Sequence, residues 1–273
     1  MKIRKEASPQ KVREFYESDL PRRVRARIDG NRRIDRAVDF MLPRIDSDSR
    51  VLDIGCGIGV ATERIAAAAS NVEVFAVDIS PAHIDYCQRT VDAENITFKT
   101  VDVIADFDEL EALVDGDIDV VTMVDVIEHL PRPEGREFFE KLGRLLSDEA
   151  KILLTYPSPQ YQRHLYGTDG ARIQAVDLVL ELDDIAALAD CADCQIRHFS
   201  YVDVWRRDQY IHCELAARLD CERFEPFDDW SSASLGSKAQ ICSQFLRQKA
   251  RKVLRPIRKR KYILSPSEHN DSP

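Results

Sequence analysis

The sequence predicts an α/β fold in which a doubly wound, mostly parallel sheet is covered by helices on both faces. Three observations lead to this prediction. Short apolar segments alternate with amphipathic segments between residues 50 and 157, a pattern typical of right-handed βαβ units. A glycine-rich turn, GCGIG, separates the first strand from the next helix. After this pattern, at residues 194–204 and 209–219, two strands follow each other without a helix, which predicts an antiparallel hairpin at the edge of the sheet.

Seven segments have the apolar or alternating pattern of strands. They are residues 50–55, 72–79, 96–103, 118–127, 150–157, 194–204 and 209–219. Helical periodicity lies between them, at residues 59–69, 80–91, 107–114, 133–146 and 181–192. Ser80 as N-cap and Pro81 at the first helical position mark one helix start. The prediction is a Rossmann-like sheet of seven strands whose last strand is antiparallel.

Helical caps are predicted on either side of this sheet. The first residues contain two polar helical patterns, and Pro43 ends the second. Residues 157–180 break the alternation and are interpreted as a loop or insertion on the substrate side. The sequence thus predicts an N-terminal cap at residues 1–48 and a main domain at residues 49–220. A basic C-terminal helical extension follows at residues 221–262, and a disordered tail at residues 263–273.

Composition restricts the class of protein. The chain has 273 residues, of which 44% are hydrophobic and 32% charged, as in globular proteins. It has neither an apolar run long enough for a bilayer nor the apolar core of a secretory signal, so we expect a cytoplasmic location. The seven cysteines predict reduced thiols. Cys191 and Cys194 have the spacing of metal ligands, but no second pair follows, and we expect no metal.

A basic segment, residues 247–261, contains nine lysines and arginines and no acid, although the net charge of the chain is -9. This asymmetry predicts a polyanionic partner, such as an anionic membrane surface, a phosphorylated carrier or nucleic acid. A peripheral location at a membrane surface would follow from the first of these. The alternative is a helix docked on the domain with its basic face in water.

The glycine turn predicts a ligand that approaches the backbone closely. Glycines between a strand and a helix leave backbone amides bare, and the helix directs its positive end at the ligand. Asp78 ends the second strand, where a carboxylate can accept both hydroxyls of a ribose. The combination predicts a cofactor that contains a nucleoside.

The details of the turn disfavour two common cofactors. The NAD fingerprint would have its third glycine where the sequence has Val60. No Lys-Ser or Lys-Thr follows, so the turn is not a Walker A loop. Asp53, two residues before the first glycine, would repel a pyrophosphate but attract an ammonium or a sulfonium.

VLDIGCGIGVAT, VFAVDIS, VDV and VDVIEHLPRP follow one another in the order and spacing of one known family. With these motifs the sequence resembles the class I methyltransferases that use S-adenosylmethionine. The last motif is similar to the small-molecule branch typified by ubiquinone-biosynthesis and trans-aconitate methyltransferases. The resemblance covers residues 45–157 well and the two C-terminal strands loosely.

The resemblance implies which residues bind S-adenosylmethionine. Three glycines give room to the methionine part, and Asp53 helps to hold its amino group directly or through water. Asp78 binds the ribose and Asp102 the adenine amino group. Two apolar residues pack beside the adenine, and a further acid lines the pocket beside the sulfonium. The full set is Asp53, Gly55, Gly57, Gly59, Asp78, Ile79, Asp102, Val103 and Asp125.

Methyl transfer by in-line displacement needs a positioned acceptor and a base where the acceptor's pKa is high. His129 follows the fourth strand at the substrate edge, and imidazole titrates near neutrality, so His129 is the candidate base. The alternative is a histidine that orients the HLPRP turn. Candidate substrate residues follow the fifth strand, at Tyr156, Tyr161, His164 and Tyr166.

These features predict methyl transfer to a small-molecule or glycan-type acceptor, with oxygen favoured over nitrogen or carbon. DVIEH stands where an NPPY or DPPY motif would indicate methylation of a nucleobase amino group. Two alternatives stay open: RNA or protein methylation that uses the basic segment, and a non-catalytic protein that binds the cofactor or a partner. The intact glycine turn disfavours the second, and the oligomeric state is not predicted.

Overall fold

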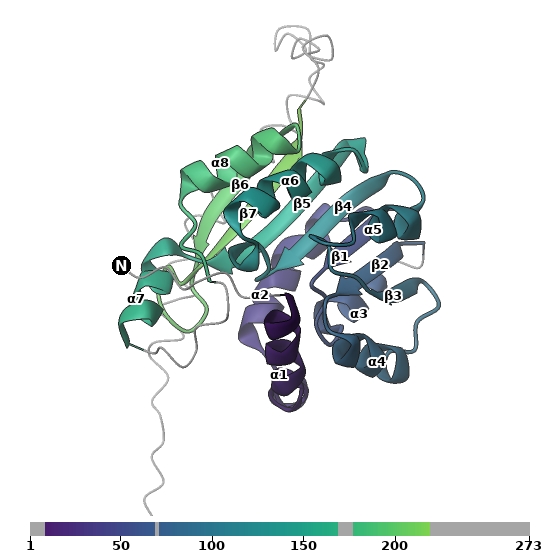
Figure 1. The fold of residues 1–273 in the computed structure, drawn as a ribbon, viewed down its shortest axis with the longest axis horizontal. Coiled ribbons are helices and arrows are strands. Elements are labelled where there is room, and N and C mark those ends of the chain that lie inside the picture. Colours follow the sequence, from purple (N-terminus) through teal and green to yellow (C-terminus); the bar gives the residue numbers. More distant parts are fainter. Residues whose placement is uncertain (1–8, 69–70, 169–176, 219–273) are drawn as a thin grey trace, which may run out of the picture. The chain divides into compact units, whose positions relative to one another are not determined.

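The computed structural model describes residues 9–68, 71–168 and 177–218, which form one sheet flanked by helices (Figure 1). The strands are β1 (Arg50–Ile54), β2 (Glu73–Asp78), β3 (Ile96–Thr100), β4 (Ile118–Val124), β5 (Leu146–Pro157), β6 (Cys194–Val202) and β7 (Tyr210–Ala217). They lie in the order β3-β2-β1-β4-β5-β7-β6. Strands β1 to β5 are parallel, and β7 is antiparallel to both of its neighbours. The predicted seven-stranded fold is confirmed.

Helices cover both faces of the sheet. They are α1 (Pro9–Asp29), α2 (Arg32–Met41), α3 (Val60–Ala66), α4 (Pro81–Thr90), α5 (Phe107–Val114), α6 (Arg132–Gly143), α7 (Pro159–Thr168) and α8 (Leu182–Cys191), with short 3-10 turns η1 (Leu42–Arg44) and η2 (Ile127–His129). Alternate side chains of β1 point to opposite faces. Val51 packs with residues of α2 and α3, whereas Leu52 packs in the larger cluster with residues of α5, α6 and α8. In Figure 1 these last three helices lie together on one face.

The segment predicted as a loop contains α7, which corrects that part of the interpretation. The hydroxyl oxygen of Ser158 accepts from the backbone N–H of Tyr161 at 3.3 Å, and Pro159 occupies the first helical position. Ser-Pro therefore starts this helix just as Ser80-Pro81 starts α4. The pattern after it is too polar to reveal the helix, because only Pro159 and Gln162 are buried.

Two further boundaries differ from the sequence prediction. Helix α1 continues through Pro21 to Asp29, well beyond the pattern that predicted it. Strand β4 ends at Val124, because Asp125 has a φ of 56° and turns the chain out of the sheet. The predicted basic extension and tail lie outside the described residues. Within the three described ranges, no helix combines the length and the apolar character needed to cross a membrane.

The N-terminal helices place side chains at the carboxyl edge of the parallel strands. The buried face of α2 consists of Ala37, Val38, Phe40 and Met41. Helix α1 reaches the glycine turn through Arg27, whose guanidinium donates to the carbonyl oxygen of Ile58 at 3.0 Å and to the carboxylate of Glu63 at 2.7 Å. Figure 1 shows α1 and α7 on the side of the sheet toward which β4 points.

Candidate active site

Four features predicted from the sequence meet at the carboxyl edge of the parallel strands. The glycine turn follows β1, Asp78 ends β2, Asp102 follows β3 and Asp125 follows β4. These strands are neighbours in the sheet. A doubly wound sheet binds ligands at this edge, on either side of the strand where the order reverses.

The three glycines of the turn have φ values of 69°, 57° and 75°, which side chains other than glycine rarely adopt. At Gly55 a Cβ atom would lie 2.5 Å from Cγ2 of Val126, so bare backbone there is required by packing within the chain. A Cβ at Gly57 would instead meet Nη1 of Arg23, at 3.3 Å. Gly57 therefore faces the charged side chains of the site.

Asp78 is held in place by three donors before any ligand binds. One carboxylate oxygen accepts from the backbone N–H of Gly57 at 2.9 Å. The other accepts from the backbone N–H of Ser80 at 2.9 Å and lies 3.2 Å from Nδ1 of His83. Burial alone would raise the pKa of Asp78, but His83, the Ser80 amide and the charge of Arg23 together hold it below its ordinary value. Asp78 is therefore an ionised, oriented acceptor.

Asp53 is in a different environment from the one predicted. The residue is 2% exposed, and its two carboxylate oxygens accept from the hydroxyls of Thr62 at 2.6 Å and Thr122 at 2.8 Å. Burial raises its pKa to about 6. Asp53 thus connects β1 to α3 and β4 beneath the glycine turn and presents almost no surface to a ligand.

Asp102 stabilises the turn after β3. Its Oδ1 atom accepts from the backbone N–H groups of Ile104 and Ala105 at 3.1 and 3.2 Å. This arrangement fixes the carboxylate through one of its oxygens. Ile79 and Val103, predicted to flank an adenine, are both half-buried.

Asp125 forms an ion pair with Arg33, a residue of α2 that the sequence reasoning missed. The backbone N–H of Asp125 donates to the carbonyl oxygen of Thr155 at 2.8 Å, which fixes the residue between β4 and β5. Burial is the main cause that lowers the pKa of Arg33. A cofactor that has a carboxylate is stabilised by a cation nearby. The sequence signal that could have identified such a cation was the pair of arginines that follows Asn31.

His129 lies in η2 between two carboxylates. Its Nδ1 atom is 3.1 Å from Oδ1 of Asp177, and its Nε2 atom is 3.8 Å from Oε1 of Glu128. Glu128 is 2% exposed, and its burial raises its pKa against the lowering effect of the His129 charge. Asp177 was also missed, because it is 48 residues away along the chain from His129 and belongs to no motif.

The four predicted substrate residues separate into different environments. Tyr156 has no exposed surface and packs in the hydrophobic core, so its prediction as a pocket residue is corrected. Tyr161 and His164 line an open groove of about 610 Å³ between α7 and the β6–β7 connection. The hydroxyl of Tyr166 donates to the carbonyl oxygen of Asp177.

The groove combines aromatic and basic side chains. Nη1 of Arg206 lies 3.3 Å from Nε2 of His164. The Tyr161 ring lies 6.0 Å from that of Tyr210, which connects the groove with the part of the site near Arg33. Among the described residues, no three His, Cys, Asp or Glu side chains are grouped so that they could hold a metal ion.

A family model described as a methyltransferase domain matches residues 24–204. The chain belongs to this family. Among curated relatives, this methyltransferase is 24% identical over 138 residues to a ubiquinone biosynthesis O-methyltransferase of Dechloromonas aromatica, a match that covers 50% of the chain and 54% of the relative. It is 37% identical over 70 residues to ribosomal RNA small subunit methyltransferase C of Shewanella sediminis. This match covers 25% of the chain and 20% of the relative. The chain thus spans about half the length, or less, of these relatives.

Solved structures share the fold of this methyltransferase. Magnesium protoporphyrin IX methyltransferase from Synechocystis PCC 6803, with bound SAH, has a TM-score of 0.58 and 20% identity over 76% of this chain and 98% of that one. The N-methyltransferase NodS from Bradyrhizobium japonicum WM9, in complex with S-adenosyl-L-homocysteine, has a TM-score of 0.61 and 15% identity. This match covers 77% of this chain and 100% of that one. The predicted membership in the class I methyltransferases is confirmed.

Proposed function

We propose that this S-adenosylmethionine-dependent methyltransferase transfers a methyl group to an oxygen atom of a small-molecule or glycan-type acceptor. The observation that carries the proposal is the Asp78 carboxylate, which is fixed at the end of β2 by the backbone N–H of Gly57. When bound, S-adenosylmethionine supplies an electrophilic methyl group on a sulfonium. The residues of the chain hold that cofactor and place the acceptor.

The polar groups at the carboxyl edge fit the parts of this cofactor. Asp78 accepts the ribose hydroxyls, because its orientation is already fixed. Asp102 accepts the adenine amino group, and Ile79 and Val103 pack beside the ring. Arg33, which forms an ion pair with Asp125 at the end of β4, is the residue that we propose for the carboxylate of the methionine part.

His129 accepts the proton of the acceptor hydroxyl. Its side chain is 11% exposed, so it is enclosed but reachable. The acceptor extends from there toward Tyr161 and His164, which line the groove beside α7. Oxygen is favoured over nitrogen because a hydroxyl needs a base at neutral pH, and because several curated relatives are O-methyltransferases.

Calorimetric titration with S-adenosylmethionine, S-adenosylhomocysteine and NAD tests the cofactor. We expect the two adenosyl compounds to bind and NAD not to bind. Transfer to phenols, sugars and amines is then followed by formation of S-adenosylhomocysteine, and the product bond is identified by NMR. Binding of NAD alone, or a product methylated only on nitrogen, contradicts the proposal.

RNA methylation is the second candidate. It is favoured by the match to a ribosomal RNA methyltransferase and by the nine basic residues of 247–261, a segment outside the described residues. Binding to a polyanion through phosphate contacts weakens steeply as salt rises. Retention of RNA that is lost with salt, together with methyl transfer to that RNA, distinguishes this candidate from the first.

A further inference from the structure

We propose that the groove beside α7 binds an acidic group of the acceptor, a phosphate or a carboxylate attached to a ring, through the guanidinium of Arg206. The groove is the open space of about 610 Å³ between α7 and the β6–β7 connection. The inference rests on the proposed function, in which the acceptor extends from the cofactor into this groove. It narrows the acceptor to anionic molecules.

The groove lies at the same edge of the sheet as the cofactor site. Pro157, the last residue of β5, and Val202, the last of β6, both pair with Tyr210, the first residue of β7. Helix α7 and the β6–β7 connection therefore leave the sheet at the carboxyl end of β5, the neighbour of β4. The ring of Tyr161 lies 6.0 Å from that of Tyr210. Burial raises the pKa of Tyr210 to about 12, and the nearby charge of Arg33 acts in the opposite direction. The groove thus adjoins the part of the site near Arg33.

The turn that carries Arg206 is fixed by a buried side chain. The backbone N–H groups of Trp205 and Arg206 donate to Oε1 of Gln209, at 3.0 and 3.1 Å. Gln209 is 2% exposed. Its backbone carbonyl oxygen accepts from the N–H of Ser158, just before α7, at 2.9 Å. The turn and the start of α7 are therefore joined before an acceptor binds.

Arg206 has a positive charge that no carboxylate neutralises within the part of the chain that the structure describes. Its Nη1 atom lies 3.3 Å from Nε2 of His164 in α7. A guanidinium only donates, so this contact directs Arg206 toward α7 and leaves its charge in place. The acids of the same turn have other contacts. Asp203 accepts from the N–H of Asp208 at 2.9 Å, and Asp208 lies 3.4 Å from Nε of Arg207. Arg206 is therefore suited to a bidentate pair with an oxyanion.

Aromatic side chains line the groove from α7 and from β6. Tyr161 and His164 have ring centroids 6.5 Å apart and planes 26° apart. Tyr201, near the end of β6, is 45% exposed. Exposed aromatic faces in a groove pack against the rings of ligands. A cation beside such faces fits a ring that carries an acidic group.

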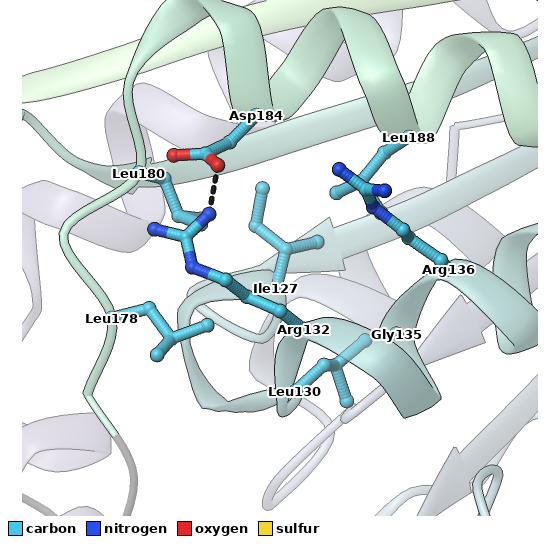
Figure 2. Close-up of a pocket in the computed structure, with 9 residues that line it drawn as sticks. All are labelled: Ile127, Leu130, Arg132, Gly135, Arg136, Leu178, Leu180, Asp184 and Leu188. Atoms are coloured by element: carbon cyan, nitrogen blue, oxygen red, sulfur yellow. Dashed lines mark hydrogen bonds and ion pairs between the residues drawn. The ribbon is translucent and has the colours of Figure 1, made fainter.

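The small pocket between η2, α6 and α8 has a different character (Figure 2). It holds about 20 Å³, which is room for roughly one water molecule. Figure 2 shows Arg132 of α6 directed at Asp184 of α8, with which it forms an ion pair. Most of the other lining side chains are leucine and isoleucine. This pocket cannot hold a ring, whereas the groove beside α7 has both the room and an unneutralised cation.

Titration of the full-length protein, saturated with S-adenosylhomocysteine, tests the proposal without a methyl-transfer assay. The probes are phenyl phosphate, benzoate and phenol at constant ionic strength. Proton–nitrogen NMR spectra follow the Nε–H group of each arginine, and Arg206→Gln assigns the signal of Arg206. We expect at least one of the two anions to bind about tenfold more tightly than phenol, since a charge-assisted hydrogen bond contributes such a factor, and to shift the Arg206 signal. The tighter anion identifies the acidic group.

Arg206→Gln should reduce the affinity for that anion to the level of phenol. Arg206→Lys, which keeps the charge without the planar fork, should reduce it less. Arg197→Gln is the matched control, because it removes the same charge from an exposed position on β6 that does not line the groove. Anions that bind no better than phenol overturn the proposal, and so does an Arg206→Gln loss no larger than that of the control. Failure of the wild type to bind S-adenosylhomocysteine would instead count against the proposed function.

Discussion

At the scale of single residues, two buried aspartates at the same sheet edge have opposite protonation behaviour. Asp78 accepts hydrogen bonds from two backbone N–H groups and lies beside the ring of His83, and these contacts lower its pKa. Asp53 accepts from the two neutral hydroxyls of Thr62 and Thr122 among the described residues, and burial is the largest effect on its pKa. The first is suited to bind a ligand, whereas the second stabilises the turn from within.

Replacing Asp78 with Ala should weaken S-adenosylhomocysteine binding by roughly 2 to 4 kcal/mol, because a charge-assisted acceptor is lost. Calorimetry measures the change, and Asp78→Asn separates the loss of charge from the loss of shape. Asp85→Ala in α4 is the control, since Asp85 is exposed. Unchanged affinity in both Asp78 variants would place the cofactor elsewhere.

Asp53 should make the stability of the fold depend on pH. Its pKa in the folded chain is about 6, above the ordinary 3.8. The folded state therefore binds the proton more tightly, and the stability that this group contributes is full below about pH 4 and lost as pH rises through 6. Relative to Asp53→Asn, the free energy of unfolding of the wild type should fall by roughly 2 to 3 kcal/mol between pH 4 and 7.

Urea denaturation at several pH values measures this difference. Asp39→Asn is the control, because Asp39 is exposed on α2. A wild type and an Asp53→Asn variant whose stabilities run parallel across this range would show that folding does not raise the pKa of Asp53.

At the scale of elements, periodic segments were predictable and contacts between distant segments were not. The strands were found because each buries apolar side chains at a spacing that the sequence displays. Helix α7 carried the start signal Ser158-Pro159 but little apolar periodicity. Arg33 and Asp177 could not be assigned, because α2 and the segment before α8 reach the site only through the tertiary fold.

Helix α1 should slow the exchange of cofactor. Arg27 joins it to the carbonyl oxygen of Ile58 within the glycine turn and to Glu63 of α3. Arg27→Ala removes both contacts and should raise the dissociation rate of S-adenosylhomocysteine about tenfold, the effect of one charged hydrogen bond. Stopped-flow displacement measures the rate. Arg25→Ala, on the exposed face of α1, should have no effect, and equal rates in both variants would contradict this role.

At the scale of the whole molecule, the seven described strands and the residues assigned to the candidate site lie before residue 219, within the described ranges. The family match ends earlier, at residue 204. Deleting residues 247–273 should therefore leave the affinity for S-adenosylhomocysteine and the melting temperature unchanged. Calorimetry and thermal denaturation measure both quantities, and a loss of either would show that the basic segment belongs to the folded core.

Val126 lies over Gly55 and directly precedes the turn that carries Glu128 and His129. The wall of the cofactor turn and the support of the proposed base are therefore one continuous piece of chain. Where the acceptor binds at His129 as proposed, any factor by which the cofactor changes acceptor affinity equals the factor by which the acceptor changes cofactor affinity.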